Sequence, residues 1–598
     1  MHLNLKDKSI FKLVPLFYII SSSFLLGLVI IPTITQARAV LIFPRLGHAL
    51  QGPAVYGKIY NNTFDYYLDE CIIIYISITP SEALIPPIWF NKDFWNISIV
   101  PSVLLNYNLT FLKIEKIIPV ENIGTIFGSI ALNELYKSAI GIICKVPANL
   151  EPVIYNIIVS FRKEISKQLI ESGEIKIDFE PGGYQGVKGS ANVFGINQFI
   201  LTEPCCLVFP WIYDLKSNDN LSKITIEGKY FPQFTFIHET DMHFTYKNSS
   251  YYEELIKFKR DMEVLAPNFI VISGDLIDSP YYEPEAFNLA YEFLKSMNVP
   301  LIITCGNHDQ KLLSPWYYFF GSINTITKFD NLHLITFDSS LPISSNMMNW
   351  IDNGLKDIPE SHPKFIICHY PPHVDYFSYG WLGITNLAMQ YNVKAILAGH
   401  YHLDFISYIK DLQEAILNYK TDQNIESFEI IKSIQSKFDS TFNYSDVIKE
   451  PLLILTRSGA KGGYVLGNET SPKYSGYRRF IVANDEIYNF TYDYNGNGMP
   501  DPQVCVPNGR FNTNLTFNSG KWTLTLNSSF NENIISARGV FKIPSPNNEY
   551  KWDLVPENKT NGAYIRAYLD DGVNCYIDTR VYIPKNSIIN LQIEEVAL

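Results

Sequence analysis

The chain has no excess of basic residues. Its 598 residues include 48 lysines and arginines against 60 aspartates and glutamates, which gives a net charge of −12 at pH 7. These charges are spread along the sequence rather than gathered in a tail. Proteins that bind nucleic acid non-specifically carry a basic patch or stripe, so we expect no nucleic-acid partner. A small anionic substrate remains compatible, because bound metal ions would dominate the local field.

The composition also lacks the polar bias that is typical of disordered chains. Charged residues make up 18% of the sequence, hydrophobic residues 47% and aromatic residues 14%. This is enough apolar material for packed cores. At roughly 150 residues for each domain, a chain of this length is expected to hold three or four units.

Long apolar runs are missing except near the start of the sequence. Residues 13–31 are apolar, follow three lysines and precede Ala37-Arg38-Ala39. A basic segment, an apolar segment and an A-x-A motif together predict a secretory signal peptide that is cleaved after Ala39. The apolar run is long for a signal peptide, so an uncleaved signal anchor that holds the chain in a membrane is the alternative. Both interpretations predict a secreted or cell-surface protein.

Acceptor motifs for N-glycosylation agree with export. In an asparagine-rich chain many such motifs arise by chance, so they support export without proving it. None lies between residues 248 and 443. The acceptors are Asn61, Asn96, Asn108, Asn220, Asn248, Asn443, Asn468, Asn489, Asn514, Asn527 and Asn558.

Cysteine is scarce, with eight residues in the chain. In an exported protein, disulfide pairing is the default expectation. Cys505 and Cys575 are the only cysteines in the last hundred residues, so they form the first predicted pair. Cys71 with Cys144 is the second predicted pair. Two others follow strand-like segments and are expected to be buried free thiols: Cys305 and Cys368.

Histidine, in contrast, is concentrated in one part of the chain. Nine of the eleven histidines lie between residues 238 and 402. Five short motifs in this segment each follow an apolar run that is typical of a β-strand, namely 234–237, 269–272, 301–303, 365–367 and 395–397. Ligands at the ends of successive strands of one α/β sheet converge, so we expect one site. The motifs are Asp241-Met242-His243, Gly274-Asp275, Gly306-Asn307-His308-Asp309, Cys368-His369 and Gly399-His400-Tyr401-His402.

The residue types in these motifs suit a site that holds two metal ions. Metal-assisted phosphoester hydrolysis needs two cations about 3.5–4 Å apart, a shared carboxylate and an open edge for water and phosphate. Asp275 follows a glycine, which lets the backbone turn so that the carboxylate can bridge. Asp241 and His243 are two residues apart on an extended segment and can face the same side. The same spacing recurs in His400 and His402.

Single motifs of this kind are mostly chance matches, and only the ordered set indicates a metal site. The mixture of oxygen and nitrogen ligands favours Mn, Fe, Zn or Co. It argues against a calcium site or a zinc site built from thiolates.

The segment 231–492 carries all these motifs in order and resembles the calcineurin-like metallophosphoesterases. The resemblance implies a four-layer α/β/β/α core and in-line attack on phosphorus by a hydroxide that the metals hold. It also implies that His308 is not a ligand but protonates the leaving oxygen, with Asp309 orienting its imidazole. The implied ligands are Asp241, His243 and His402 for the first ion and Asn307, His369 and His400 for the second, with Asp275 as the bridge.

This sequence differs from one branch of that superfamily at two positions, and the difference bears on which kind of metal site is expected. Purple acid phosphatases replace the histidine of the D-x-H motif and place a tyrosine ligand three residues after the bridging aspartate. This sequence retains His243 and has Asp278 at the tyrosine position, so an iron–tyrosinate site is not expected. The nucleotide-clamping domain of extracellular nucleotidases has its own motifs, which do not occur after Asp501.

Some nearby residues allow two interpretations. His373, four residues after His369, either reaches the substrate or lies in an exposed loop. The aromatic run 316–320 either lines a pocket for an organic leaving group or, as we favour, belongs to the core. His238 is expected to be a core residue with its hydrogen bonds satisfied.

A second, independent motif predicts calcium. Asp493, Asn495 and Asn497 place oxygen atoms at alternate positions, a glycine is sixth, and Asp501 follows. This matches the first part of a calcium loop. The twelfth position is Val504 rather than glutamate, so the motif is not an EF-hand and resembles the shorter acidic loops of extracellular repeat proteins. A plain Asn-Gly turn is the alternative.

The predicted fold class is α/β, with the phosphoesterase core flanked by β-sandwich domains. Residues 40–230 show short β-type runs, with a helix candidate at 162–172. Residues 231–501 alternate strands with helices and would form the catalytic domain. Within it, 404–450 has the spacing of one or two inserted helices, as a lid or a dimer contact. Residues 502–598 return to short β-type runs.

Helical apolar spacing marks three further segments of the central region. These helix candidates are 251–265, 284–297 and 345–355.

Two functions of different classes fit the sequence. The first is an exported dinuclear-metal phosphoesterase that acts on a small phosphomonoester or phosphodiester. The alternative is a surface-associated binding or structural protein whose phosphoesterase fold is catalytically silent. A silent fold would not need seven ligands together with His308, so the enzyme is favoured. A nuclease fits poorly with export and with the acidic charge. The oligomeric state is not predicted.

Overall fold

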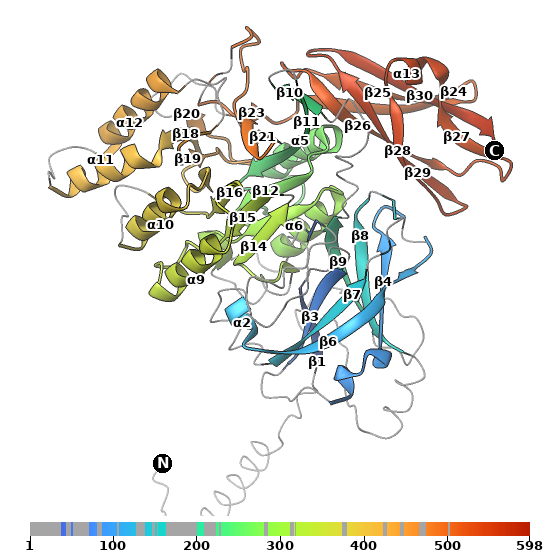
Figure 1. The fold of residues 1–598 in the computed structure, drawn as a ribbon. Coiled ribbons are helices and arrows are strands. Elements are labelled where there is room, and N and C mark those ends of the chain that lie inside the picture. The colour runs from blue at the N-terminus through green and yellow to red at the C-terminus, as the bar shows by residue number, and fades with distance from the viewer. Residues whose placement is uncertain are drawn as a thin grey trace, which may run out of the picture.

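The protein is a mixed α/β molecule, and Figure 1 shows its computed structural model. The central part of the chain lies between blue N-terminal sheets and red C-terminal sheets. The structure describes residues 38–43, 50–51, 71–79, 87–104, 107–126, 138–145, 147, 150–151, 153–162, 200–208, 223–226, 229–279, 285–310, 316, 319–329, 331–372, 379–421, 427–442, 448–465, 474–499, 501 and 503–598.

The first central sheet has seven strands in the order β13-β12-β11-β21-β22, with β10 paired to β11 and β23 paired to β21. Strands β11, β12 and β13 are parallel, whereas β21 runs antiparallel to β11. The strands are β10 (Lys223–Ile226), β11 (Lys229–Glu239), β12 (Phe269–Ser273), β13 (Leu301–Thr304), β21 (Gly476–Ala483), β22 (Glu486–Asn489) and β23 (Val506–Pro507).

The second central sheet also has seven strands, in the order β14-β15-β16-β17-β19-β18-β20. Strands β15, β16, β17 and β19 are parallel to one another. The strands are β14 (Thr325–Phe329), β15 (Leu332–Thr336), β16 (Lys364–Ile367), β17 (Ala395–Ala398), β18 (Leu403–Tyr408), β19 (Leu452–Leu455) and β20 (Tyr464–Val465).

The two central sheets pack face to face through an aromatic cluster. The ring of Phe236 stacks on Phe269 and Phe480 of its own sheet, with centroids 5.0 Å and 4.5 Å away. It meets the edge of Phe365 from the other sheet at 5.5 Å. Because both faces of these strands are covered, their sequences are almost continuously apolar, as expected for buried parallel strands.

Helices cover the outer faces of the two sheets. Apolar residues of α5 and α6 pack on the first sheet, and those of α9, α10 and α11 pack on the second. Local signals set the helix ends: the Ser249 hydroxyl caps α5 by accepting a hydrogen bond from the Tyr252 amide at 3.1 Å. The helices are α5 (Ser250–Leu265), α6 (Glu285–Ser296), α7 (Asn307–Gln310), α9 (Ser345–Lys356), α10 (Tyr379–Gln390), α11 (Ile409–Thr421) and α12 (Ser427–Thr441).

The N-terminal part of the chain contributes two further sheets, in the orders β1-β3-β7-β6 and β2-β9-β8-β4-β5. Their elements are β1 (Arg38–Phe43), β2 (Leu50–Gln51), β3 (Cys71–Thr79), η1 (Pro87–Phe90), η2 (Lys92–Phe94), β4 (Trp95–Pro101), β5 (Thr110–Phe111), β6 (Lys113–Glu121), α2 (Ile123–Ile126), β7 (Ser138–Lys145), β8 (Tyr155–Phe161) and β9 (Ile200–Val208).

The C-terminal part forms a four-stranded sheet, β24-β25-β30-β27, and a three-stranded sheet, β26-β29-β28. Helix α5 of the central region contacts both β24 and β26. The elements are β24 (Phe511–Asn518), β25 (Lys521–Ser528), β26 (Ile534–Pro544), β27 (Tyr550–Leu554), α13 (Pro556–Thr560), β28 (Tyr564–Asp570), β29 (Asn574–Ile583) and β30 (Ile588–Ala597).

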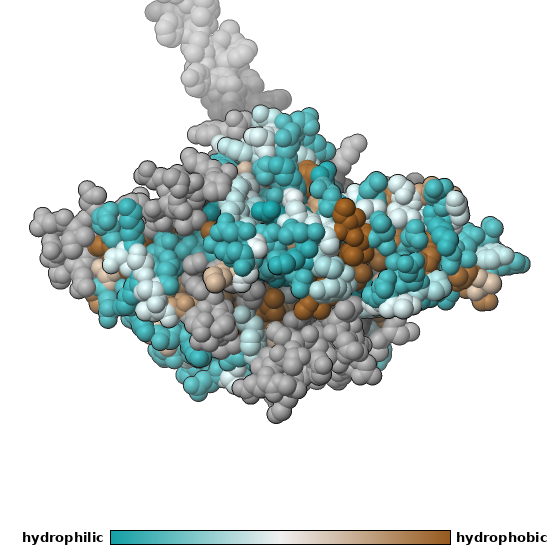
Figure 2. All heavy atoms as spheres, turned by 90° about the horizontal axis from the view of Figure 1, so that it is seen from above, coloured by the Kyte–Doolittle hydropathy of each residue, from teal (hydrophilic) through white to brown (hydrophobic). Residues whose placement is uncertain are grey.

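The surface of the described residues is mostly hydrophilic in the view of Figure 2, with hydrophobic residues gathered in a band toward one end. Within these residues, no helix has the length and apolar character needed to span a membrane. The predicted N-terminal signal segment at 1–39 lies outside the described residues except for residues 38 and 39.

Several secondary-structure predictions are confirmed. The helix candidates 251–265, 284–297 and 345–355 correspond to α5, α6 and α9. The segment 404–450 contains two helices, but they start only at Ile409 because β18 continues the sheet to Tyr408. The helix candidate at 162–172 falls outside the described residues except for Arg162.

The first predicted disulfide is wrong, because Cys505 and Cys575 are free and buried. Cys505 lies beside β21, where its backbone amide donates a hydrogen bond to Asp404 at 2.9 Å. Cys575 lies within β29, opposite Ile543 of β26. Each thiol is thus packed in the core of a different part of the molecule.

The second predicted disulfide is wrong as well, because Cys144 forms no disulfide bond. In the antiparallel ladder of β3 and β7, Cys144 lies opposite Ile72, and Cys71 lies opposite Lys145. The register therefore offsets the two cysteines by one position along the ladder. The prediction of free, buried thiols is confirmed for Cys305 and Cys368.

Candidate metal centre

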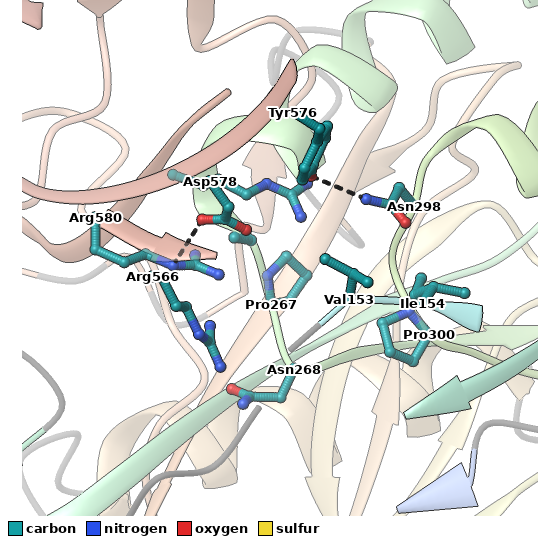
Figure 3. Close-up of a pocket in the computed structure, with 12 residues that line it drawn as sticks. Val153, Ile154, Pro267, Asn268, Asn298, Pro300, Arg566, Tyr576, Asp578 and Arg580 are labelled. Atoms are coloured by element: carbon teal, nitrogen blue, oxygen red, sulfur yellow. Dashed lines mark hydrogen bonds and ion pairs between the residues drawn. The ribbon is translucent and has the colours of Figure 1, made fainter. Parts of the chain in front are cut away.

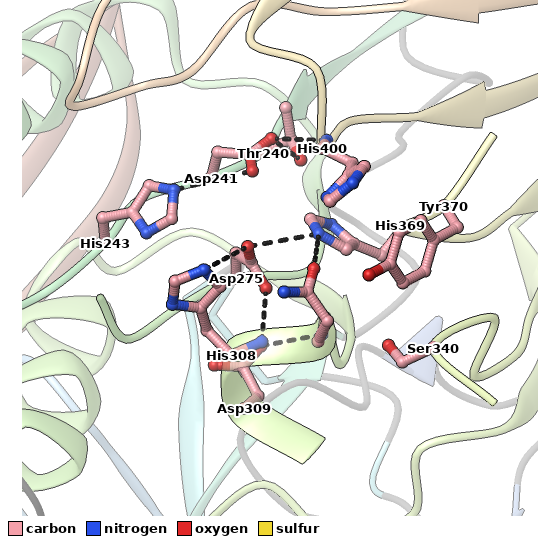
Figure 4. Close-up of polar contacts among 12 residues, drawn as sticks. Thr240, Asp241, His243, Asp275, His308, Asp309, Ser340, His369, Tyr370 and His400 are labelled. Carbon is pink, nitrogen blue, oxygen red and sulfur yellow. Dashed lines mark hydrogen bonds and ion pairs between the residues drawn. The ribbon is translucent and has the colours of Figure 1, made fainter. Parts of the chain in front are cut away.

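The predicted ligands lie at the carboxyl ends of five strands from both central sheets. Strands β11, β12 and β13 of the first sheet lead into the first three motifs, and β16 and β17 of the second sheet lead into the other two. Because the sheets face each other, these strand ends meet, and Figure 4 shows their side chains directed toward a common centre. The structure therefore brings together all seven: Asp241, His243, Asp275, Asn307, His369, His400 and His402.

The backbone at this centre adopts a conformation that non-glycine residues rarely use. Asp241 and His243 have φ angles of 54° and 49°, and Asp275 has 51°. His400 and His402 have φ angles of 72° and 52°. Each such residue costs of order 1–3 kcal/mol, and strain of this kind clusters at functional sites. The chain turns sharply after each strand and directs these side chains back over the sheet edge.

The first group of ligands consists of one carboxylate and two imidazoles. The Nε2 atoms of His243 and His402 lie 3.1 Å apart, and Asp241 Oδ1 lies 3.1 Å from His402 Nε2 and 3.6 Å from His243 Nε2. The other oxygen, Oδ2, accepts hydrogen bonds from the His400 amide at 2.9 Å and the Thr240 hydroxyl at 2.8 Å. Two imidazole nitrogens that face each other beside a fixed carboxylate oxygen are suited to share a cation.

The second group surrounds Asp275. His369 Nε2 lies 3.2 Å from Asp275 Oδ2 and 3.1 Å from Asn307 Oδ1, and His400 completes the group. The Nδ1 atom of His369 donates to the Ser273 carbonyl at 2.9 Å, so Nε2 of the neutral ring carries no proton and can bind a metal ion. The other Asp275 oxygen, Oδ1, accepts a hydrogen bond from the His308 amide at 2.9 Å. This bond fixes the Asp275 carboxylate between the first and the second group of ligands.

Two glycines in the motifs are required by close packing against these carboxylates. A Cβ atom at Gly306 would lie 2.1 Å from Asp275 Oδ1, and one at Gly399 would lie 2.5 Å from Asp241 Oδ2. Any side chain at either position would displace a predicted ligand. The glycines thus allow the loops to approach the carboxylates directly.

The charges at the centre suit a cation. Burial alone would raise the pKa of the Asp241 carboxyl. Hydrogen bonds from His243 and His402 outweigh this effect of burial and hold the pKa of Asp241 well below the usual value. Burial lowers the pKa of His369, but Asp275 outweighs that effect and raises the pKa to about 9. At His400, burial followed by the neighbouring His369 lowers the pKa to about 4. Protons on imidazoles thus balance the buried carboxylates, and metal ions would replace those protons.

The comparison with known protein families agrees with this arrangement. Residues 234–404 match the family model described as calcineurin-like phosphoesterase. The calcineurin-like phosphoesterase domain, residues 234–404, thus contains the five ligand motifs. Domains of this class are metal-dependent phosphoester hydrolases, in agreement with the ligand set described above.

Two curated relatives match parts of the phosphoesterase domain. One component of the nuclease SbcCD from Staphylococcus epidermidis is 42% identical over 59 residues, which is 9% of this chain and 16% of the relative. The glycerophosphodiester phosphodiesterase GpdQ from Enterobacter lignolyticus is 27% identical over 158 residues, 23% of this chain and 56% of the relative. The chain therefore spans less than two thirds of the length of each.

Among solved structures, a purple acid phosphatase from yellow lupin (Lupinus luteus) seeds has 10% sequence identity and a TM-score of 0.37. The comparison covers 76% of this chain and 70% of that one. A likeness at this level carries no argument about the present chain.

The phosphoesterase domain holds His308 beside the metal ligands. Its Nε2 atom lies 3.8 Å from Asp275 Oδ2, and its Nδ1 atom is hydrogen-bonded to the Asp278 carbonyl oxygen. Asp309 is predicted to orient this ring. Its carboxylate is instead fully buried and accepts hydrogen bonds from three backbone amides, those of Leu276, Ile277 and Gly306. The contacts correct that expectation, since Asp309 holds two of the ligand loops together. Burial and then the neighbouring Asp275 raise the pKa of Asp309 to about 7.

Asp278 is a residue of the candidate centre to which the sequence pointed only as the position of an absent tyrosine. Its carboxylate lies 3.3 Å from His243 Nδ1, forms an ion pair with Lys461, and is half-buried. The contact with the His243 ring, the largest cause, lowers the pKa of Asp278 below the usual range. Asp278 thus orients His243 through its side chain and His308 through its carbonyl. Its position three residues after Asp275 was the available signal.

The other predicted residues have varied outcomes. His238 is a buried core residue that contacts Ser273 and Thr456 hydroxyls, as expected. The core interpretation of 316–320 holds for its described residues, since Trp316, Phe319 and Phe320 are buried. His373 lies outside the described residues.

The predicted calcium residues share one loop. Asp493 accepts the amides of Asn497 at 3.1 Å and Gly498 at 2.8 Å, and the Asn495 side chain donates to Asp501 at 3.1 Å. Calcium binding by this loop stays a prediction.

Proposed function

We propose that the protein is an exported dinuclear-metal phosphoesterase that hydrolyses a small phosphomonoester or phosphodiester. The observation that carries the proposal is the convergence of two ligand groups, Asp241 with His243 and His402, and Asp275 with His369 and His400, on one strand-end surface. The calcineurin-like phosphoesterase match over 234–404 supports it.

The residues present fit two transition-metal ions, such as Mn, Fe, Zn or Co. Asp241, His243 and His402 would hold the first ion, Asn307, His369 and His400 the second, and Asp275 would contact both. When bound, the ions polarise the phosphoryl group and activate water as the nucleophile. Retention of His243 and the ion pair of Asp278 with Lys461 argue against an iron–tyrosinate site.

In the proposed reaction, His308 supplies the proton that the leaving oxygen needs. The Asp278 carbonyl holds Nδ1–H, which directs Nε2 toward the metal ligands, 3.8 Å from Asp275 Oδ2. A proton on Nε2 can then pass to the oxygen of the departing alcohol as its bond to phosphorus breaks. The amide of His308 also fixes Asp275, so one residue joins ligand positioning to proton transfer.

The proposal extends to location and architecture. The N-terminal apolar segment supports export, with the mature chain secreted or anchored at the cell surface through that segment.

We also propose that the two central sheets and their helices form the four-layer α/β/β/α core, and that the flanking sheet pairs are β-sandwiches. The catalytically silent, surface-associated binding protein is the alternative, but it leaves the strained ligand backbone without a purpose.

Metal analysis and two artificial substrates test the proposal. The purified chain should contain two equivalents of transition metal and hydrolyse a nitrophenyl phosphomonoester or phosphodiester. Asp275→Asn should lose activity by at least about 100-fold, because the bridging charge is removed. Asp352→Asn on the outer helix α9 is the matched control and should keep wild-type activity. A metal-free chain that cleaves neither substrate would favour the silent alternative.

A further inference from the structure

A loop that none of the sequence motifs includes packs against the candidate metal centre. Residues 456–463 follow β19 of the second sheet. The Ser458 hydroxyl donates a hydrogen bond to the Asp241 carbonyl oxygen at 2.7 Å. A Cβ atom at Gly463 would lie 2.1 Å from the carbonyl oxygen of His402. The loop therefore contacts both segments that carry the first group of ligands.

Lys461 lies in this loop, and its side chain forms an ion pair with Asp278. The two side chains are only 24% and 22% exposed, so water screens the pair less than it screens a surface pair. The Lys461 Nζ atom also lies 5.7 Å from the centroid of the Tyr251 ring on α5. The backbone amide of Lys461 donates to the Ser458 hydroxyl at 2.8 Å. Both the backbone and the ammonium group of Lys461 are thus held in place.

The oxygen of Asp278 that pairs with Lys461 also faces a predicted metal ligand. Asp278 Oδ1 lies 3.3 Å from His243 Nδ1, and no other group within the described residues forms a hydrogen bond with this buried nitrogen. The other ring nitrogen, Nε2, faces His402 Nε2 at 3.1 Å. A proton on Nδ1 leaves Nε2 of the neutral ring free to bind an ion. Lys461, Asp278 and His243 therefore form a line of contacts that ends at the first group of ligands.

A carboxylate can orient a metal-binding imidazole only when its own position is fixed. Asp278 is partly exposed, so water competes with His243 for its oxygen atoms. The ammonium of Lys461 opposes this competition, because it attracts the carboxylate toward the side on which His243 lies. The backbone carbonyl of Asp278 contacts His308 Nδ1, so a displaced Asp278 would also disturb the proposed proton donor.

We propose that Lys461 is a positioning residue, which holds Asp278 where its carboxylate directs His243 Nε2 toward the first ion. Lys461 is not itself a ligand, because a protonated amine has no lone pair to offer. It acts through Asp278 and through that residue on His243. The inference rests on the proposed function, since it requires that His243 binds a metal ion.

The test is the metal affinity of the full-length chain after its ions have been removed with a chelator. Titration with Mn²⁺ should show two binding steps, and the step that His402→Asn weakens identifies the first ion. Loss of a residue that supports a metal-binding histidine costs about 10–100-fold in affinity. Lys461→Met removes the ammonium and should weaken the first step about tenfold, with the other step unchanged. Lys461→Arg keeps a cation and should recover most of this loss.

A double-mutant cycle tests whether Lys461 acts through Asp278. Asp278→Asn alone should weaken the first step by about 10–100-fold. Residues that act through one another give coupled rather than additive effects. Lys461→Met should therefore cause no further loss when it is added to Asp278→Asn. A double variant whose loss equals the product of the two single losses would overturn the proposal.

Lys394 provides the matched control for the loss of a shielded lysine. Its Nζ atom pairs with Glu486 at 3.1 Å, and its side chain is 12% exposed. Lys394 precedes the amino end of β17, whereas the ligand His400 follows the carboxyl end of the same strand. Lys394→Met should therefore lower the unfolding temperature and leave both binding steps unchanged.

Asn298 provides a second control, for a general loss of stability. Figure 3 shows its side chain donating to Tyr576 where the N-terminal, central and C-terminal parts of the chain meet, with a distance of 3.1 Å. Asn298 precedes β13, whereas the ligand Asn307 follows the carboxyl end of that strand. Asn298→Ala should destabilise this junction without weakening either binding step.

An unchanged first step in Lys461→Met would overturn the proposal. An equal loss of affinity in Lys394→Met or Asn298→Ala would also overturn it, because the effect would then reflect stability alone. The readout is binding and does not require turnover. A chain that binds Mn²⁺ with the expected pattern but hydrolyses neither nitrophenyl ester would support the role of Lys461 and contradict only the proposed reaction.

Discussion

At the scale of single residues, the candidate centre depends on backbone conformation as much as on ligand type. Asp241, Asp275 and His400 lie in the left-handed region, where a side chain is unfavourable without compensation. Hydrogen bonds supply part of this compensation. For example, the His308 amide donates a hydrogen bond to the Asp275 carboxylate. Asp309 supplies another part by accepting three amides from the ligand loops. The residues around the ligands therefore form a rigid support for ion binding.

A prediction at this scale concerns His308. The change His308→Asn should lower kcat by about 10²–10⁴-fold, the usual contribution of a general acid. The loss should be smaller for a nitrophenyl ester, whose leaving group departs without a proton, than for an alkyl ester. Metal content should stay at the wild-type level, because His308 is not a proposed ligand. Steady-state kinetics on both esters and metal analysis measure these effects.

His362→Asn serves as the control, since His362 contacts His333 on another part of the sheet and should leave activity unchanged. Equal losses on both esters would contradict the role of His308 as a proton donor.

At the scale of elements, helix α5 connects the phosphoesterase domain to the C-terminal sheets. Asp261 on this helix is fully buried and accepts hydrogen bonds from Gly509 N at 2.8 Å, Phe511 N at 3.0 Å and the Tyr477 hydroxyl at 3.2 Å. Two of these donors precede or begin β24, and the third lies in β21. One carboxylate thus sets how the C-terminal part meets the central sheet.

The change Asp261→Ala should destabilise this junction by about 3 kcal/mol or more, because it leaves two buried donors and one half-buried donor without a partner. Limited proteolysis and thermal unfolding of the full chain should show earlier loss of the C-terminal part. Glu253→Ala, at an exposed position of the same helix, should have little effect. A similar midpoint for both variants would mean that Asp261 does not carry the junction.

At the scale of the whole molecule, three groups of sheets share one chain, and each group has at least one exposed glycosylation motif in or next to it. Asn108, Asn248, Asn514 and Asn527 belong to glycosylation motifs and are exposed. They lie on the N-terminal part, just before the start of α5, and on the C-terminal sheets. Glycans at Asn108, Asn514 and Asn527 would lie outside the loops that carry the ligand motifs.

Expression in a eukaryotic secretory host tests this arrangement. The protein should reach the medium or the cell surface and lose mass when treated with an N-glycosidase. Replacing the four exposed asparagines by glutamine should remove most of that mass change without loss of phosphoesterase activity. N-terminal sequencing distinguishes cleavage after Ala39 from a retained anchor. Retention of an unmodified chain in the cytosol would contradict export.

The sequence by itself determined which residues meet at the candidate centre and which strands present them. Apolar runs such as 269–272 are covered on both faces, so their composition alone marks them as buried strands. Helix α5 was predicted from its apolar spacing, and the Ser249 cap fixes its start. By contrast, α10 and the β14–β15 hairpin were missed, because their apolar residues are arranged by tertiary packing rather than by a clear local period.

Only the tertiary structure decided which charged groups face one another. Asp309 follows His308 in the chain, yet its carboxylate accepts hydrogen bonds from amides of the loop after Asp275 and from the Gly306 amide of its own loop. The Asp278 carbonyl contacts the His308 ring instead. The free state of Cys505 and Cys575 depends in the same way on how distant strands pack. Local patterns determine strands and helices, whereas contacts between distant residues depend on the packing of the whole chain.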